Sequence, residues 1–179
     1  MKPLIIAIIG KSGSGKTTAV EYIEKVFNIP MIQSWTDRPK RFQGEIGHTF
    51  VSTEDFDVFR KSDMIAFTQF GGNRYCCLKT DVKALNTYVI DEAGIDYLEK
   101  HFKNKYFIKK VFIKRDKDLR VQSVGADRIA RDKTMYYHDE DFFDVVIENN
   151  STEEELFNTI DNIIGKTMEE YKEEYRNAI

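Results

Sequence analysis

The chain has 179 residues, which is enough for one domain with a substantial core and too few for two ordinary domains. Its net charge of −3 excludes a global basic field that would draw it to nucleic acid or to a membrane surface, so neither is an expected partner. Two adjacent cysteines, Cys76 and Cys77, and an N-terminal apolar run too short for a signal peptide indicate a cytoplasmic protein without a membrane span.

The first predicted elements are a strand and a helix joined by a glycine-rich connection. A β-branched run over residues 4–9 predicts a strand buried on both faces, and apolar residues at helical spacing from Val20 to Phe27 predict the helix. The connection fits the pattern G-x-x-x-x-G-K-[ST] at every fixed position and reads Gly10-Lys11-Ser12-Gly13-Ser14-Gly15-Lys16-Thr17-Thr18. Glycines let the backbone wrap around a phosphate, and the start of the helix presents its positive dipole end to the same anion.

We therefore predict that residues 10–18 bind the phosphates of ATP. Lys16 supplies a mobile charge to the β- and γ-phosphates and is expected to be catalytic, and the Thr17 hydroxyl is expected to bind Mg²⁺. The alternative is a glycine-rich turn with a chance lysine, against which the flanking strand and helix both argue.

Further along the chain, strands and helices alternate except in one segment. The expected strands cover residues 31–35, 48–51, 65–70, 74–77, 87–91, 106–113 and 145–147. The expected helices are a small one capped by Thr53, an amphipathic one through Phe102, a polar one over 116–137, and a long C-terminal one capped within 151–154. This order predicts an α/β fold of three layers, α/β/α, with a central, mostly parallel sheet, interrupted by an inserted subdomain over about 31–80.

Two guanidinium groups lie three residues apart, on a loop that Pro39 stiffens. They belong to Arg38 and Arg41, and their arrangement suits a dianionic phosphate held by bidentate hydrogen bonds. The alternative is a basic loop that is simply solvated, as most surface charge runs are.

Several segments resemble the guanylate kinase family. They are Ser34-x-Thr36-x-Arg38-x-x-Arg41 followed by Gly44-Glu45, His48-Thr49-Phe50-Val51-Ser52-x-Glu54-Asp55-Phe56, Gly72-Asn73-Arg74-Tyr75, and Phe143-Asp144-Val145-Val146-Ile147-Glu148-Asn149. With the glycine-rich connection, the resemblance covers most of the chain. It implies a P-loop kinase that moves the γ-phosphoryl group of ATP onto a nucleoside monophosphate (NMP). The implied parts are a core (1–30, 81–114 and 143–179), an NMP-binding insert (about 31–80) and a mobile helical lid (about 115–142).

By position, the resemblance implies that Ser34 contacts the base and that Arg38, Arg41 and Tyr75 hold the acceptor phosphate. His48 stands where the family usually has a tyrosine on that phosphate. A histidine still donates a hydrogen bond, and its charge varies with pH. The alternative for His48 is an ordinary strand-edge residue.

Asp91 ends a predicted core strand, at the sheet edge where ligands of open α/β folds bind. It is expected to orient the acceptor or to hold Mg²⁺ through water. The alternative is that Asp91 caps the helix that starts at Glu92.

The chain departs from the family where the family reads guanine. Ala66 aligns with a base-contacting glutamate, and the family's second acidic contact has no clear match near Ala93-Gly94. The family's closing Tyr-Gly-[Ser/Thr] is Tyr75-Cys76-Cys77. A carboxylate that pairs with guanine discriminates against other bases, because a wrong base leaves it unpaired. The acceptor is therefore GMP- or dGMP-like or has another base, and Thr68, Gln69 or Trp35 are the alternative base contacts.

In the lid, the resemblance implies arginines that reach the transferring phosphoryl group. Arg128 and Arg131, three residues apart on one helix face, are the expected catalytic pair, and Arg120 precedes them. The alternative is a charged surface helix in which Asp127 and Asp132 are salt-bridge partners.

The sequence thus predicts an NMP kinase that uses ATP and Mg²⁺, with nucleotides as its partners, acting as a monomer or homodimer. Two alternatives stay open. One is a P-loop kinase of a nucleoside or another small metabolite, and the other is a non-catalytic guanylate kinase-like binding module.

Overall fold

The structure, a computed structural model, describes residues 2–125, 129, 130, 132 and 137–176. Its main sheet consists of parallel strands in the order β6-β1-β7-β8. These strands are β1 (Leu4–Ile9), β6 (Leu85–Val89), β7 (Phe107–Lys114) and β8 (Val145–Glu148). Every residue of β1 is buried, as the apolar run predicts for a central strand covered on both faces.

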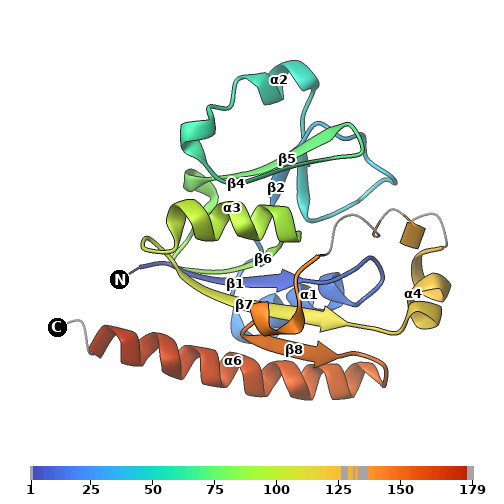
Figure 1. Ribbon diagram of the computed structural model, residues 1–179, viewed down its shortest axis with the longest axis vertical. Coiled ribbons are helices and arrows are strands. Elements are labelled where there is room, and N and C mark those ends of the chain that lie inside the picture. The colour runs from blue at the N-terminus through green and yellow to red at the C-terminus, as the bar shows by residue number, and fades with distance from the viewer. Residues whose placement is uncertain (1, 126–128, 131, 133–136, 177–179) are drawn as a thin grey trace.

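Helices cover both faces of the main sheet. Helices α1 (Lys16–Phe27) and α6 (Glu153–Arg176) lie on one face, and α3 (Glu92–Phe102) lies on the other (Figure 1). Because side chains alternate along a strand, Ile6 and Ile8 pack with α1 and α6, whereas Ile5 and Ile9 pack with α3. The predicted three-layer α/β/α fold is confirmed.

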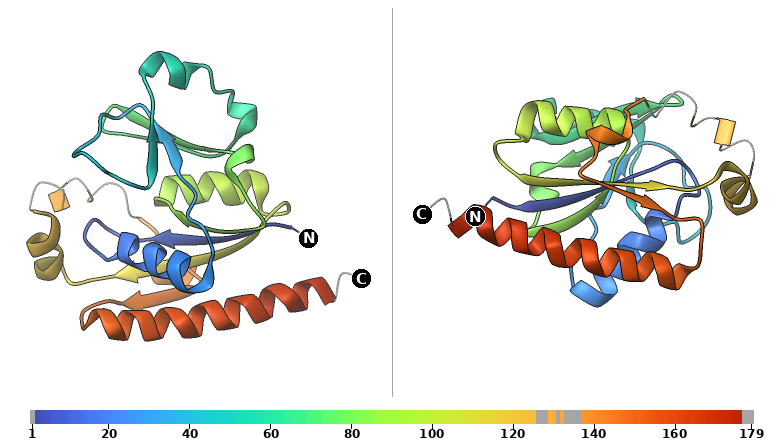
Figure 2. Two further views of the ribbon diagram at one scale, coloured as in Figure 1. Left: turned by 180° about the vertical axis from the view of Figure 1, so that it is seen from behind. Right: turned by 60° about the horizontal axis from the view of Figure 1, so that its bottom comes forward.

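A small sheet in the order β3-β2-β5-β4 is built from residues 34–78. Its strands are β2 (Ser34–Thr36), β3 (His48–Phe50), β4 (Met64–Phe70) and β5 (Asn73–Leu78). Helix α2 (Thr53–Asp57) and a short 3₁₀ helix over Lys61–Asp63 connect β3 to β4, and a second 3₁₀ helix over Lys79–Asp81 follows β5 on the way to β6. Ile65, Ala66 and Cys77 join the core around α3, so α3 lies between the two sheets (Figures 1 and 2).

Three predicted elements are corrected. Ser52, not Thr53, caps α2, because the Ser52 hydroxyl accepts a hydrogen bond from the Asp55 N–H at 3.0 Å. The helix predicted over 116–137 is not continuous, since α4 (Lys117–Val124) ends at Gly125, where φ is 81°. The strand predicted from Met31 starts only at Ser34, and Met31 forms an isolated bridge with Thr87.

The C-terminal part follows the prediction more closely. A 3₁₀ helix over Glu140–Phe142 precedes β8, and the Thr152 hydroxyl caps α6 by accepting from the Glu155 N–H at 3.2 Å. Within the described ranges, no helix combines the length and the apolar character that crossing a bilayer requires.

Candidate functional site

The connection between β1 and α1 forms a tight loop, residues 10–15, which we call the glycine-rich loop. Gly15 has a φ of 104°, and a Cβ there would lie 2.5 Å from the Asn149 side-chain nitrogen. That nitrogen donates to the Ser14 carbonyl at 2.8 Å and so ties the loop to the end of β8. A side chain at position 15 would break this contact, which explains the glycine physically.

Lys16 begins α1 and turns its ammonium group back over the loop. Its Nζ donates to the Gly10 carbonyl at 2.6 Å and to the Lys11 carbonyl at 3.1 Å. Thr17 follows in the first turn of α1 and is exposed. Main-chain donors, a lysine and a threonine hydroxyl therefore gather at the helix N-terminus, a combination suited to binding a polyphosphate and a divalent cation.

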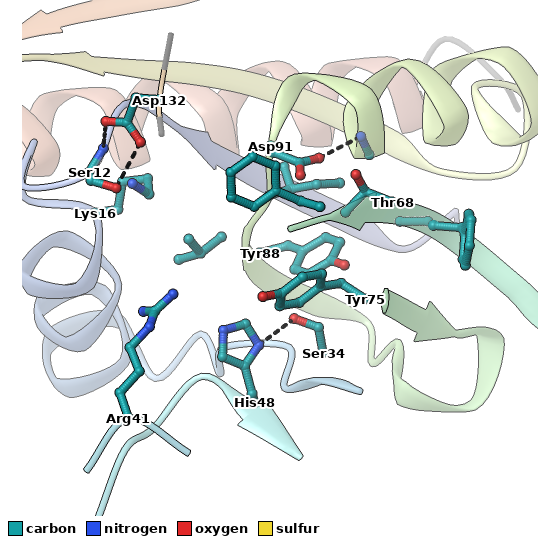
Figure 3. A pocket seen from close by; sticks show the side chains of 16 residues that line it. Ser12, Lys16, Ser34, Arg41, His48, Thr68, Tyr75, Tyr88, Asp91 and Asp132 are labelled. Carbon is teal, nitrogen blue, oxygen red and sulfur yellow. Dashed lines mark hydrogen bonds between the residues drawn. The ribbon is translucent and has the colours of Figure 1, made fainter. Parts of the chain in front are cut away.

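A cavity of about 180 Å³, here called the inner cavity, lies between the two sheets. Its lining includes most of the residues predicted for the acceptor and two predicted for ATP, namely Ser34, Arg41, His48, Tyr75 and Asp91, with Ser12 and Lys16. Figure 3 shows Asp91 and Thr68 toward one end of this cavity and Lys16, Ser12 and Asp132 at the other. The structure thus brings together residues that lie far apart in the sequence, from Ser12 to Asp132.

A second cavity of about 470 Å³, here called the loop cavity, lies against the glycine-rich loop. Gly13, Gly15, Thr17 and Thr18 line it together with Arg115. Four residues line both cavities, namely Lys16, Arg41, His48 and Val89. A molecule in the inner cavity and one in the loop cavity would therefore meet at these four side chains.

Arg38, in contrast, lines neither cavity. Its guanidinium is buried and pairs with Glu45, at 2.7 Å between Nη2 and Oε1, and it also donates to the Pro39 carbonyl at 2.8 Å. Within the part of the chain that the structure describes, the buried Arg38 Nε has no hydrogen-bond partner. Its role in holding a phosphate stays a prediction, because Glu45 and the Pro39 carbonyl already bind its two terminal nitrogens in this arrangement.

Glu45 also holds the next arginine. Its carboxylate accepts from the Arg41 N–H at 2.8 Å and lies 3.4 Å from Arg41 Nη1. Burial alone would raise the pKa of Glu45, but hydrogen bonds from Arg38 and Arg41 lower it below the ordinary value. Sequence reasoning quoted Glu45 without a role, and its position four residues after Arg41 was the available signal.

His48 lies on β3 with Nδ1 at 3.2 Å from the Ser34 hydroxyl, and its ring centre is 5.6 Å from that of Tyr75. Burial, together with the charge of Arg38, lowers the pKa of His48 to about 4. The ring is therefore neutral near pH 7, and its charge changes only in acid. Ser34 and Tyr75 join it in the wall of the inner cavity.

Asp91 satisfies the helix-cap alternative and also reaches the inner cavity. Its Oδ1 accepts from the Gly94 N–H at 2.7 Å, which caps α3, and its carboxylate accepts a hydrogen bond from Thr68. Burial raises the pKa of Asp91 despite these hydrogen bonds.

The other proposed base contacts differ in position. Thr68 and Ala66 line the inner cavity, whereas Gln69 does not. Trp35 also lies outside the lining, and its indole N–H donates to Asp81 at 3.0 Å. Of the three alternatives for reading the base, only Thr68 is placed where a molecule in this cavity could touch it.

The arginine-rich segment contacts the glycine-rich loop from the outside. Arg115 donates to the Gly13 carbonyl at 3.4 Å, and Arg120 is buried in an ion pair with Asp132 at 3.3 Å. The pairing of Asp132 was one of the alternatives that the sequence offered. Arg128 and Arg131, the predicted catalytic arginines, lie outside the described residues.

The comparisons with known proteins support the fold. The chain is similar to the crystal structure of guanylate kinase from Anaplasma phagocytophilum, with a TM-score of 0.62 and 20% identity over 93% of this chain and 87% of that one. A crystal structure of an uncharacterized protein from Eubacterium ventriosum ATCC 27560 has a TM-score of 0.48 and 16% identity over 90% and 98% of the two chains. No protein-family model and no curated protein matched the chain. The first likeness shows a guanylate kinase-like fold.

Proposed function

We propose that this protein is an ATP-dependent kinase of a nucleoside monophosphate, and that the inner cavity holds the acceptor while the glycine-rich loop holds ATP. The observation that carries the proposal is that Lys16, Arg41 and His48 line both cavities. A phosphoryl donor and its acceptor must lie end to end in the transition state, and two cavities that share these side chains provide that arrangement.

In the proposed reaction, the chain contributes alignment and charge rather than a covalent intermediate or a general base. Lys16 turns from the loop carbonyls toward the β- and γ-phosphates, and Arg41 reaches the acceptor phosphate from the opposite wall. Arg115 lines the loop cavity with a buried Nε that has no partner among the described residues, so it has a donor to offer to the transferring group. Arg128 and Arg131 stay candidates for the same task.

The residues at the start of α1 fit a magnesium ion, because an exposed threonine hydroxyl follows the lysine beside the phosphate-binding backbone. Thr17 would hold the ion directly. Asp91, which the sequence offered as a contact through water, lines the other end of the inner cavity, and we propose it for orienting the acceptor instead. When bound, Mg²⁺ neutralises charge on the donor phosphates.

The base end of the inner cavity is mostly apolar, with Thr68 and Asp91 as its polar groups near Ala66. One carboxylate that already accepts two hydrogen bonds offers less to guanine than a dedicated pair of acids. We therefore propose a purine or pyrimidine monophosphate acceptor whose base is not restricted to guanine.

A coupled assay of ADP release over the common ribo- and deoxyribonucleoside monophosphates tests the proposal. The expected result is acceptor-dependent turnover with at least one of them, abolished in Lys16→Ala and strongly reduced in Arg41→Ala. The exposed substitution Lys25→Ala on α1 is the matched control and is expected to leave turnover unchanged. Absence of acceptor-dependent turnover with every monophosphate would refute the proposal.

The ion pair between Arg38 and Glu45 favours a second candidate, a P-loop kinase of a nucleoside or another small metabolite. Because Glu45 already neutralises Arg38, this loop would contribute less binding free energy to a phosphate on the acceptor. Including unphosphorylated nucleosides in the same assay separates the two candidates, because the second predicts turnover with a nucleoside and none with its monophosphate.

A further inference from the structure

A buried carboxylate lies directly against the glycine-rich loop. Asp132 is 4% exposed, and its two oxygens contact one residue of the loop. Oδ2 accepts from the Ser12 N–H at 2.8 Å, and Oδ1 accepts from the Ser12 hydroxyl at 2.9 Å. Both dashed contacts are drawn in Figure 3, and 120 residues of sequence separate the partners.

Arg120 of α4 completes this contact from the other side. Its Nη1 lies 3.3 Å from Asp132 Oδ2 and donates to the Ser12 carbonyl at 3.4 Å, and the side chain is buried. Helix α4 packs closely here, since a Cβ on Gly13 would lie 3.1 Å from the Arg120 carbonyl. The N–H, hydroxyl and carbonyl of Ser12 are thus all bound by side chains from outside the loop.

The hydrogen-bond donors around Asp132 are of the kinds that commonly bind anions in proteins. A main-chain N–H, a hydroxyl and a guanidinium are groups that bind a phosphate oxygen as readily as a carboxylate oxygen. Ser12 and Asp132 line the inner cavity together with Lys16, the lysine proposed for the β- and γ-phosphates. The chain's own carboxylate therefore occupies an anion position at the end of the cavity where the terminal phosphate of a donor would lie.

We propose that Asp132 is a specificity-determining residue of the donor site, which opposes binding of a nucleoside triphosphate more strongly than binding of a diphosphate. This inference rests on the proposed function. In the structure, Asp132 holds Ser12 and Arg120, and the terminal phosphate of ATP must displace this carboxylate or lie beside it. Like charges in a desolvated site repel, whereas ADP carries no γ-phosphate to meet the repulsion.

Titration calorimetry of the full chain with ATP and with ADP tests the inference through Asp132→Asn. The isosteric amide removes the negative charge and leaves Arg120 with an unpaired positive charge. We expect ATP to bind about tenfold more tightly than to the unmodified protein and ADP to bind within about twofold. Asp118→Asn, the same change at an exposed position on α4, is expected to leave both affinities unchanged.

A second variant, Asp132→Glu, tests the same inference if Asp132→Asn folds poorly. Asp132→Glu retains the charge that neutralises Arg120 and extends the carboxylate by one methylene group into the cavity. We expect it to weaken ATP binding more than ADP binding, so the two variants shift the ATP-to-ADP ratio in opposite directions. A purely structural Asp132 predicts that both nucleotides lose affinity together in both variants.

An unchanged ATP-to-ADP ratio in either folded variant, or a ratio that falls in Asp132→Asn, would overturn the inference. The proposed function fails separately, if the unmodified protein binds neither nucleotide. If the unmodified protein binds both and the ratio does not respond to Asp132, only the inference fails.

Discussion

The Glu45 carboxylate faces the Arg38 guanidinium across 2.7 Å, and both side chains are almost fully buried. A second contact joins Arg38 Nη1 to the other Glu45 oxygen at 3.3 Å, and the Arg41 N–H adds a third hydrogen bond at 2.8 Å. The Glu45 carboxylate therefore links both arginines of the loop, through the Arg38 side chain and the Arg41 main chain. These contacts fix the shape of the loop, and Glu45 partly cancels the positive charge of the two arginines.

Replacing Glu45 by Gln is expected to lower the free energy of unfolding at pH 7 by about 3 kcal/mol, because it leaves a buried guanidinium without its counter-charge. The folded-state pKa of Glu45 is lowered, so its stabilisation is present above the unfolded-state pKa and is lost as the pH falls through the folded-state pKa. Urea unfolding should therefore show the difference between the two proteins shrinking in acid. Glu54→Gln, at an exposed position, is the control, and equal stability of Glu45→Gln and the unmodified protein at pH 7 would contradict the prediction.

His48 should make the protein less stable in mild acid. Its pKa is about 4 in the folded chain against an ordinary value of 6.5, so between these pH values the unfolded chain binds a proton that the folded chain does not. Stability is then expected to fall with decreasing pH across this window, by at most about 1.4 kcal/mol per pH unit, and to flatten below it.

The variant His48→Gln tests that expectation, since glutamine is similar in size and does not titrate in this range. Its unfolding free energy should vary less than that of the unmodified protein between pH 6.5 and pH 4. His101→Gln on α3 is a matched control at an exposed histidine. Parallel pH profiles for His48→Gln and the unmodified protein would show that His48 does not carry the effect.

Local patterns explain why much of the fold could be predicted. The six buried residues of β1, the glycine spacing and the helical spacing of α1 each lie within one short stretch, where residue type alone limits the backbone. The predicted cap of α2 was wrong because two neighbouring residues could each have capped the helix. Ser52 and Thr53 are both good caps, and the loop geometry before α2 decided for Ser52.

The site was predictable to the extent that its residues follow a motif in sequence. Ser34, Arg41, His48 and Tyr75, which the resemblance assigns to the acceptor, line one cavity, and their contacts with an acceptor stay a prediction. The pairing of Ser12 with Asp132 connects residues 120 positions apart, and no local pattern encodes such a contact. Charge pairing within the chain, as between Arg38 and Glu45, also could not be distinguished in sequence from charges that await a ligand.

Arg74 is expected to position the loop that carries Arg38 and Arg41 without itself touching the acceptor. Its Nε donates to Asp37 Oδ2 at 2.6 Å, its N–H donates to Asp37 Oδ1 at 2.7 Å, and its guanidinium also binds Asp57 and the Thr53 carbonyl. Asp37 immediately precedes Arg38, while the neighbouring Tyr75 lines the inner cavity. Arg74 thus fixes the start of the loop to β5 and α2.

In Arg74→Lys, a single ammonium cannot reproduce the forked contact with Asp37. We expect the KM for the acceptor to rise about tenfold, a change of about 1.4 kcal/mol, with the affinity for ATP unchanged. Steady-state kinetics with the acceptor varied, together with ATP titration, measures both quantities. Arg60→Lys applies the same substitution at an exposed site, and an equal loss of ATP and acceptor binding in Arg74→Lys would instead indicate general misfolding.

Ala66 is the position at which the proposed base preference can be tested, because it is 2% exposed within β4 and lines the inner cavity. The sequence resemblance places a base-contacting glutamate at this position. In Ala66→Glu, a carboxylate beside Thr68 would accept hydrogen bonds from the donor edge of guanine, and other bases would leave it unpaired. The ratio of kcat/KM for GMP to that for the other monophosphates is expected to rise at least about tenfold.

The matched control is Ala66→Gln, which has nearly the same size but places an amide donor in the cavity and should not produce the guanine preference. Both variants bury a polar group and are expected to lower the melting temperature, so their folding must be compared first. If Ala66→Glu folds and its preference among the monophosphates equals that of Ala66→Gln, then β4 does not face the base, and the assignment of the inner cavity to the acceptor loses its support.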